Sequence, residues 1–593
     1  MKTKKPLNPL YFSLLSVLVG IIAGLGAVVF RGLIAIFHNL LFLGKFSYLY
    51  DANAHTPPSP WGALIILVPV LGAFGVAFLV KNFAPEAKGH GVPEVMDAIY
   101  YSRGIIRPVV AVIKSVASAL SIGSGGAIGR EGPIIQIGSS FGSTLGQLIP
   151  MPVWQRLTLI AAGAGGGIAA TFNTPVGGVL FAVEIMMHEL SVRTLVPVTI
   201  ATATATYIGR AFFGDHPSFI IPKFQTPYFH ITQPLILFAY LGLGIIMGLV
   251  STIYIKSIYA FEDFFEKRIK RSYYFRHMTG MLLVGVTMYL LFVTQGHYYV
   301  EGVGYATVQD ILTGTLSSLG ILMLLFVLKL MTVSLTLGSG ASGGIFSPGL
   351  FMGATLGGAY GVILDILFPS LTISPPAFAV AGMAGVIGGS TGAAMAAIVM
   401  IFEMTLDYNV IIPMTITVAL SFGIRKFLSR ESIYTLKLAR RGHNMPESLQ
   451  ADYHYMRRAR DIMETPANVI SPNYPLDKFV RERSDQDSIS YYVVADDAGI
   501  QGVISNYTAL KALSRSDDPL TVEDVASKNY IAVTENTTMF DVLTRMRANV
   551  ASVALVTDRS QPTSCSDVKG LISKEVIAKS TEEALELFAD ESP

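Results

Sequence analysis

Two glycine-rich stretches, Gly123-Ser-Gly-Gly-Ala-Ile-Gly-Arg-Glu-Gly-Pro133 and Gly338-Ser-Gly-Ala-Ser-Gly-Gly-Ile-Phe-Ser-Pro348, lie 215 residues apart in this chain of 593 residues. Both begin with Gly-Ser-Gly and end in proline, and Gly129 matches Gly344 at the same spacing. A glycine-rich loop that ends in proline and opens an apolar helix exposes backbone N–H groups at the positive end of the helix dipole. Such a helix start attracts anions.

A second pair of matching segments extends the repeat. Leu-Phe-Ala-Val-Glu184 corresponds to Val-Met-Ile-Phe-Glu403, 219 residues further on. Paired broken segments in two halves of a membrane protein point to a transport site. The alternative is that the glycines only let helices pack closely. The matched pair favours an anion site, and the matching positions of Glu184 and Glu403 favour a capping or pairing role for both carboxylates.

The composition indicates an integral membrane protein with a soluble extension. Apolar residues make up 51% of the chain, charged residues only 14%, and the mean hydropathy is +0.52. Residues 1–450 hold 28 Lys and Arg against 18 Asp and Glu, whereas residues 451–593 hold 15 against 23. The low charge density of the first part is typical of a lipid-embedded body. The sequence therefore predicts an acidic domain of ordinary composition after the body.

Several segments are apolar enough to cross or enter a bilayer. Lysines precede the first of them and a basic cluster follows the last, which places both termini in the cytoplasm of a multi-pass protein of the inner (plasma) membrane. The single cysteine, Cys565, allows no disulfide within the chain and fits a reducing compartment. The predicted long segments are 11–42, 61–80, 234–255, 278–295 and 319–337, the shorter ones are 108–122, 194–209 and 409–424, and 371–402 carries prolines and glycines expected to break it.

Four motifs in order resemble those of the CLC family of chloride channels and chloride/proton antiporters. They are Gly89-His-Gly-Val-Pro93, Gly129-Arg-Glu-Gly-Pro133, Gly344-Ile-Phe-Ser-Pro348 and Tyr434. The resemblance covers roughly residues 12–441. It implies an all-α polytopic membrane protein with an inverted-topology internal repeat, the CLC fold. It also implies a homodimer with a separate anion pathway in each subunit.

The resemblance implies two anion sites. The backbone N–H groups of Ile345 and Phe346 and the hydroxyl of Tyr434 would hold the central anion. The first motif would add His90 and Gly91 beside it. His90 stands where many family members carry a serine that contacts the anion, and its side chain either contacts the anion or points away from it. The difference bears on anion selectivity, and chloride is the default substrate.

The outer site would use the amides around Arg130, Glu131 and Gly132. Glu131 would be the gate, because its carboxylate mimics an anion and leaves when protonated or displaced. A carboxylate within a membrane body is costly and usually functional. The alternative is that Glu131 only pairs with Arg130 or another neighbour. Arg130 either raises the local anion concentration or lies on a solvated flank.

A second departure concerns protons. In the antiporters of this family an inner glutamate follows the position of Glu184, but here that residue is Ile185, which cannot relay a proton. The sequence therefore predicts a gated passive chloride channel with Glu131 as its gate. The alternatives are a chloride/proton antiporter that uses Glu184, His188 or Glu189 as its inner acceptor, and a transporter of another small anion.

The C-terminal part resembles a tandem CBS domain pair of α/β type, often found after the membrane part of CLC proteins. The expected organisation is a membrane domain at 1–441, a linker at 442–458 and a cytosolic pair at 459–593, divided into units at 459–518 and 519–593. Adenine nucleotide binding is doubtful, because Thr508 and Val576 stand where nucleotide-binding members carry an aspartate. Neither an enzyme motif, nor metal-ligand spacing, nor a nucleic-acid-binding surface is evident. The partners expected are a second copy of the chain, the lipid bilayer and small anions.

Overall fold

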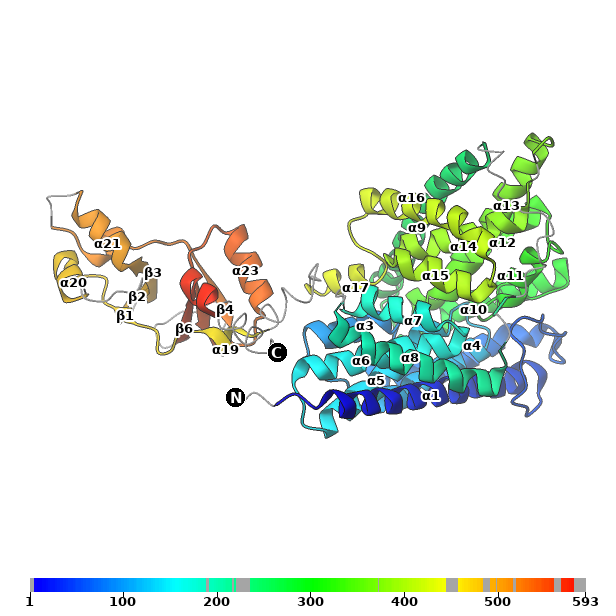
Figure 1. Ribbon diagram of the computed structural model, residues 1–593, viewed down its shortest axis with the longest axis horizontal. Helices are drawn as coiled ribbons and strands as arrows, with labels where there is room; N and C mark the ends of the chain where they lie inside the picture. Colours follow the sequence, from blue (N-terminus) through cyan, green and yellow to red (C-terminus); the bar gives the residue numbers. More distant parts are fainter. Residues whose placement is uncertain are drawn as a thin grey trace. The chain divides into compact units, whose positions relative to one another are not determined.

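The computed structural model describes residues 5–187, 191–215, 218–219, 235–371, 373–443, 457–483, 491–496, 499–515, 519–558 and 567–580. The chain divides into two compact units, residues 1–445 and 446–593. Figure 1 draws the helical unit in blue to yellow and the α/β unit in yellow through orange to red.

The first unit consists of helices of very different lengths. Among the described residues, seven helical segments are long and apolar enough to cross a membrane, which confirms the prediction of a polytopic membrane body. The helices are α1 (Pro9–Leu43), α2 (Val68–Asn82), α3 (Val92–Tyr100), α4 (Val109–Gly123), α5 (Glu131–Leu148), α6 (Val153–Phe172), α7 (Pro175–Phe181), α8 (Val192–Phe213), α9 (Leu235–Lys267), α10 (Tyr273–Gln295), α11 (Tyr305–Leu312), α12 (Leu319–Ser339), α13 (Phe346–Leu367), α14 (Pro375–Thr391), α15 (Ala394–Thr405), α16 (Ile411–Leu428) and α17 (Thr435–Arg440).

The internal repeat is visible in the packing. Helix α5 packs on α6 as α13 packs on α14. At the first contact a Cβ on Gly138 would lie 2.1 Å from the carbonyl oxygen of Gly163, and at the second a Cβ on Gly353 would lie 2.4 Å from that of Gly382. These glycines are needed for close helix packing. Close helix packing, the alternative to an anion site in the sequence analysis, therefore explains the glycines inside the helices. It does not explain the glycines of the two loops.

The segment 371–402 forms two helices, as its prolines and glycines indicated. The break lies at Gly392, which has a φ of +83° between α14 and α15. Gly388 and Gly389 instead lie inside α14, where a Cβ on Gly389 would come within 2.5 Å of the hydroxyls of Ser421 and Ser251. Those two glycines therefore permit close packing of α14 against its neighbours and do not bend the chain.

The second unit contains two three-stranded sheets of the same topology. In each sheet the first strand is parallel to the second and the second is antiparallel to the third, in the orders β1-β2-β3 and β4-β5-β6. The duplicated topology agrees with the α/β tandem pair predicted from the sequence. The elements are α19 (Ala459–Ile462), β1 (Val469–Ile470), α20 (Leu476–Arg483), β2 (Tyr491–Asp496), β3 (Gly499–Ser505), α21 (Asn506–Leu513), α22 (Val522–Val525), β4 (Tyr530–Thr534), α23 (Met539–Ala548), β5 (Val553–Thr557) and β6 (Val568–Ser573).

Candidate anion-binding site

The two glycine-rich loops meet in the middle of the helical unit. Gly129 and Gly344 exchange a pair of backbone hydrogen bonds, each 2.7 Å long. The loop of the first motif joins them, because the Gly89 N–H donates to the carbonyl of Ala341 at 2.9 Å and the Gly343 N–H donates back to that of Gly89 at 3.2 Å. The structure therefore brings together the three loop motifs that the sequence analysis singled out.

Gly132 is the position where the three loops approach most closely. A Cβ there would lie 2.0 Å from the carbonyl oxygen of His90 and 3.1 Å from the Cα of Gly344. Any larger residue at this point would force two backbone segments apart. The first helical residues of α5 and α13 are thereby held next to each other. Helix starts carry backbone N–H groups without a partner inside the helix.

Glu131 is the first residue of α5 and is 1% exposed. Its Oε1 accepts a hydrogen bond from the hydroxyl of Tyr305 at 2.6 Å and another from the hydroxyl of Ser347. Its Oε2 accepts the backbone N–H of Ser347, in the first turn of α13, at 3.2 Å. The carboxylate of one repeat thus lies at the helix start of the other, where the positive dipole end stabilises negative charge.

Arg130 is buried, with 7% of its surface exposed, so it does not lie on a solvated flank. Its guanidinium lies 5.2 Å from the ring centroid of Tyr305 and 6.0 Å from that of Phe172. Its Nε has no hydrogen-bond partner among the described residues. A buried cation next to Glu131 in the chain raises the electrostatic potential that a small anion would meet there.

The predicted central-site residues lie at the start of α13. Ile345 and Phe346 are 1% and 4% exposed, and the hydroxyl of Tyr254 donates to the carbonyl of Ile345 at 2.8 Å. Tyr434, which precedes α17, is 2% exposed and interacts electrostatically with Glu131. The structure places these groups around one buried region, with Tyr254 as a further support that the sequence analysis did not identify.

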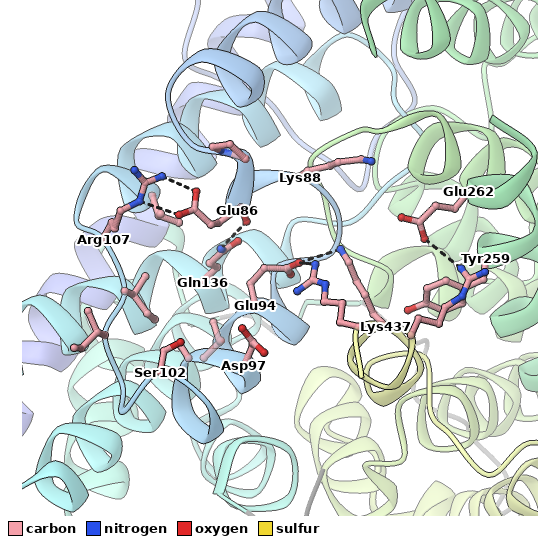
Figure 2. Close-up of a pocket in the computed structure, with 18 of the residues that line it drawn as sticks. Glu86, Lys88, Glu94, Asp97, Ser102, Arg107, Gln136, Tyr259, Glu262 and Lys437 are labelled. Atoms are coloured by element: carbon pink, nitrogen blue, oxygen red, sulfur yellow. Dashed lines mark hydrogen bonds and ion pairs between the residues drawn. The ribbon is translucent and has the colours of Figure 1, made fainter. Parts of the chain in front are cut away.

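His90 is 4% exposed, and its ring packs edge-on against Tyr259 with centroids 6.1 Å apart. Its Nδ1 has no partner among the described residues. Tyr259 also lines a cavity of about 730 Å³ between α3, α9 and α17. Figure 2 shows this cavity with Tyr259 and Lys437 on one side and Glu86 and Gln136 on the other.

Ion pairs line the cavity next to the first motif (Figure 2). Glu94 accepts from Lys437 at 3.0 Å and from Arg441 at 2.9 Å. A Cβ on Gly89 would lie 2.6 Å from the Nζ of Lys437, so this cation is next to the loop of the first motif. Helix α3 is not among the candidate membrane spans. Burial alone would raise the pKa of Glu94, but the cations of Lys437 and Arg441 lower it to about 2.

Ile185 is 4% exposed and belongs to a π-helical turn, Ala182–Met187, so the structure places an aliphatic side chain at the inner glutamate position. The neighbouring Glu184 accepts the backbone N–H groups of Met395 and Ala396 at 3.2 and 2.8 Å and so caps α15. Glu403 caps α7 in the same manner. The expected capping role of both glutamates is confirmed. His188 and Glu189, the other expected proton acceptors, lie outside the described residues.

Two buried lysines were also missed by the sequence analysis. Lys114 of α4 donates to the carbonyls of Ala87 and Gly89 at 3.0 and 2.7 Å, just before α3. Lys329 of α12 donates in the same way to the loop before α11, at the carbonyls of Val300 and Gly302, with distances of 2.9 and 3.1 Å.

The offset of 215 residues is the signal that would have found them. It relates Lys114 to Lys329, and it also relates His90 to Tyr305, the tyrosine that contacts Glu131. Each of these residues is inconspicuous alone, and the pairs become informative only when the repeat is extended beyond its glycines.

The fold and the site together define a helical membrane protein with two related halves and buried helix starts that meet at its centre. The family model described as voltage gated chloride channel matches residues 71–426, and the CBS domain model matches residues 522–579. The chain belongs to the voltage-gated chloride channel, or CLC, family.

Similar proteins include two bacterial relatives. The H(+)/Cl(-) exchange transporter ClcA of Vibrio parahaemolyticus is 35% identical over 64% of this chain and 80% of its own length. ClcA of Vibrio cholerae is 32% identical over 74% of this chain and 91% of its own length. The names of both relatives describe exchangers, which matches the alternative expectation of the sequence analysis and not the passive channel.

Two solved structures share the fold. A slow cyanobacterial Cl-/H+ antiporter aligns with a TM-score of 0.62 at 24% identity and covers 73% of this chain and 98% of its own. A eukaryotic CLC transporter aligns with a TM-score of 0.60 at 19% identity, and the alignment covers 95% of this chain and 98% of the transporter's own chain. The expected all-α inverted-repeat fold followed by a CBS unit is therefore confirmed.

Proposed function

We propose that the protein carries chloride across the membrane through the region where the three loops meet, with Glu131 as the gate. One observation carries this proposal: the Glu131 carboxylate lies at the helix start of α13, where it accepts the N–H of Ser347. A carboxylate that binds there competes with any anion that uses the same N–H donors. When it leaves, the helix starts of α5 and α13 become available to chloride.

The proposed anion-binding groups surround this position. The N–H groups of Ile345 and Phe346 with the Tyr434 hydroxyl would hold the central anion, as the resemblance implies. Around the outer position, Arg130 supplies the nearby positive charge and Gly132 a backbone donor. His90 and Gly91 would form the inner end of the pathway, next to the cavity described above.

We propose further that chloride moves in exchange for protons. The support is the similarity to the two exchange transporters of Vibrio, which outweighs the single substitution at Ile185. A passive channel is the second candidate, because the side chain at residue 185 holds no titratable group. If exchange occurs, the inner proton acceptor is another residue, and Glu184 is the neighbouring carboxylate within the described part of the chain.

A flux assay in liposomes separates the two functions. The full-length protein is reconstituted with a chloride gradient and without a pH gradient, and the external pH is recorded. An exchanger moves protons uphill as chloride runs down, whereas a channel passes chloride without proton movement. Chloride flux with no proton movement would overturn the exchange proposal and leave the chloride pathway intact.

Three variants locate the steps in the same assay. Glu131→Ala is expected to make chloride flux insensitive to pH, because the titratable gate is gone. Ile185→Glu is expected to increase the number of protons moved per chloride. His90→Ser tests the anion preference when chloride is replaced by nitrate or fluoride, and an unchanged preference would exclude contact between His90 and the anion.

The remaining proposals concern the setting of the protein. We propose a multi-pass protein of the inner membrane with both termini in the cytoplasm, on the basis of the basic residues at the ends of the helical body. We also propose that two copies form a homodimer with one pathway each. Protease digestion of intact and opened vesicles tests the orientation of the termini. Multi-angle light scattering of the purified protein measures the mass of the particle and so tests the dimer.

The α/β unit is proposed to act in structure or dimerisation. In the described part of the first CBS repeat, the Ser505 hydroxyl caps α21 by accepting the N–H of Thr508. Thr508 stands at the position where nucleotide-binding members carry an aspartate. In the second CBS repeat, the Ser573 hydroxyl accepts the N–H of Val576 in the same way. Neither Thr508 nor Val576 offers a carboxylate to a ribose. Calorimetric titration with ATP and AMP tests this proposal, and saturable binding would contradict it.

A further inference from the structure

The gate carboxylate is held by hydroxyl groups of the second repeat. The Tyr305 hydroxyl and the Ser347 hydroxyl both donate to Oε1 of Glu131, and the two hydroxyl oxygens lie 2.8 Å apart. Each hydroxyl has one proton, so both protons point at the carboxylate when it is ionised. Hydrogen bonds to an ionised acceptor are about twice as strong as neutral ones.

Tyr305 is built into the framework of the repeat. It is the first residue of α11, and the loop before it is fixed by Lys329, as Lys114 fixes the loop of His90. Its ring packs edge-on against Phe219 with centroids 5.2 Å apart, and the side chain is 1% exposed. The hydroxyl is therefore held in a defined position relative to α5 and α13.

The other ionisable groups around Glu131 come from three further elements. Arg130 precedes it on its own loop and lies over the Tyr305 ring, while Tyr254 of α9 and Tyr434 before α17 interact with Glu131 electrostatically. Within the described part of the chain, Tyr305 is the one titratable side chain that donates a hydrogen bond to the Glu131 carboxylate.

The side of the membrane follows from contacts along α1. The N–H of Leu7, two residues before α1 begins, donates to the side chain of Gln155, whereas His38 near the end of α1 contacts Glu301, just before Tyr305. Tyr305 thus lies toward the end of α1 that is remote from the N-terminus. With the N-terminus in the cytoplasm, this end is the external one.

We propose that Tyr305 is a positioning residue that latches the gate. Its hydroxyl holds the Glu131 carboxylate at the start of α13 and thereby sets the external pH and chloride concentration at which the gate opens. This inference rests on the proposed function of Glu131. A donor to the ionised form favours the carboxylate in its closed position, so a proton or an external anion must overcome the latch before the pathway opens.

Tyr305→Phe removes the latch and keeps the ring. In liposomes containing the full-length protein, the external pH of half-maximal chloride flux is expected to rise by about one unit, and the external chloride needed for half-maximal flux to fall about tenfold. Ser347→Ala is expected to shift both values in the same direction. Tyr360→Phe is the matched control, because that hydroxyl donates to the carbonyl of Ala239, away from the gate.

The Glu131→Ala background separates the latch from the gate. In that background chloride flux is expected to be independent of pH with or without the Tyr305 hydroxyl, and Tyr305→Phe is expected to leave the half-maximal chloride concentration unchanged, since the carboxylate is absent. If Tyr305→Phe gives the same pH and chloride profile as wild type while Glu131→Ala abolishes the pH dependence, the latch role of Tyr305 is wrong. The gate role of Glu131 then stands. If Glu131→Ala keeps its pH dependence, the gate itself is wrong. If Tyr305→Phe does not fold, Ser347→Ala carries the test, and an unshifted profile there overturns the latch.

Discussion

The close approach at Gly132 gives the sharpest test of the three-loop site. In Gly132→Ala the new Cβ would lie 2.0 Å from the His90 carbonyl oxygen, while ordinary van der Waals contact begins at 3.4 Å. The backbone must therefore move by about 1.4 Å, because both partners are main-chain atoms and no side chain is available to rotate away. A hydrogen bond of about 2.9 Å stretched by this amount is lost.

The expected effect is a loss of anion binding. One hydrogen bond to a charged group contributes about 1.5–3 kcal/mol, so chloride is expected to bind at least about tenfold more weakly. Isothermal titration of chloride into the purified full-length protein measures this directly. The matched control is Gly423→Ala in α16, where an added Cβ meets nothing within 4 Å.

Two outcomes bear on the reasoning. If Gly423→Ala binds chloride normally and Gly132→Ala binds about tenfold more weakly, the contact between the first and second motifs is needed for the site. If Gly132→Ala binds chloride as tightly as the wild type, the three-loop arrangement does not set anion affinity, and the anion is held elsewhere.

Further predictions concern the supports of the site. Lys329→Met removes the lysine donor from the carbonyls of Val300 and Gly302 and is expected to cost about 1–3 kcal/mol, seen as a lower thermal unfolding temperature in detergent. Lys114→Met is expected to cost less, because the carbonyls of Ala87 and Gly89 keep the Ser342 hydroxyl and the Gly343 N–H as donors. Unfolding temperatures equal to wild type would show that these lysines do not hold the loops. Glu184→Ala and Glu403→Ala each remove a helix cap and are expected to cost about 1 kcal/mol, with similar losses for the two variants because their geometries match. Tyr254→Phe removes one of the two donors to the Ile345 carbonyl, which keeps the Gly349 N–H, and is expected to weaken chloride binding in the same titration; unchanged binding would show that this hydroxyl does not support the start of α13.

The sequence predicted most of the candidate membrane helices, because hydropathy over about 20 residues reports directly on burial in lipid. The span Phe346–Leu367 was not among the predicted segments, and the span Tyr408–Leu428 was expected only as a shorter one. It was less reliable where a residue serves packing between distant segments. The prolines and glycines of the segment 371–402 were expected to break it, but Gly388 and Gly389 pack against α9 and α16, and the break is at Gly392. A list of residues does not distinguish a glycine that bends a helix from one that lets another helix approach.

The candidate site was predicted in part for a similar reason. The three motifs were found because their glycines repeat, and the structure brings them into contact. Tyr305 was missed because it shares only the preceding glycine with its counterpart His90, so the repeat is too faint there to be noticed. Its hydrogen bond to Glu131 depends on the three-dimensional arrangement of α5 and α11, which spacing alone does not reveal.

The reciprocal caps have a consequence for biosynthesis. The N–H groups at the start of α7 are satisfied by Glu403, a residue made more than two hundred positions later, and those at the start of α15 by Glu184 of the first half. Lipid offers no substitute donor or acceptor for such groups. The first half therefore cannot reach its final form as it leaves the ribosome, and must wait in the membrane, with α7 uncapped, until the end of α15 has been synthesised.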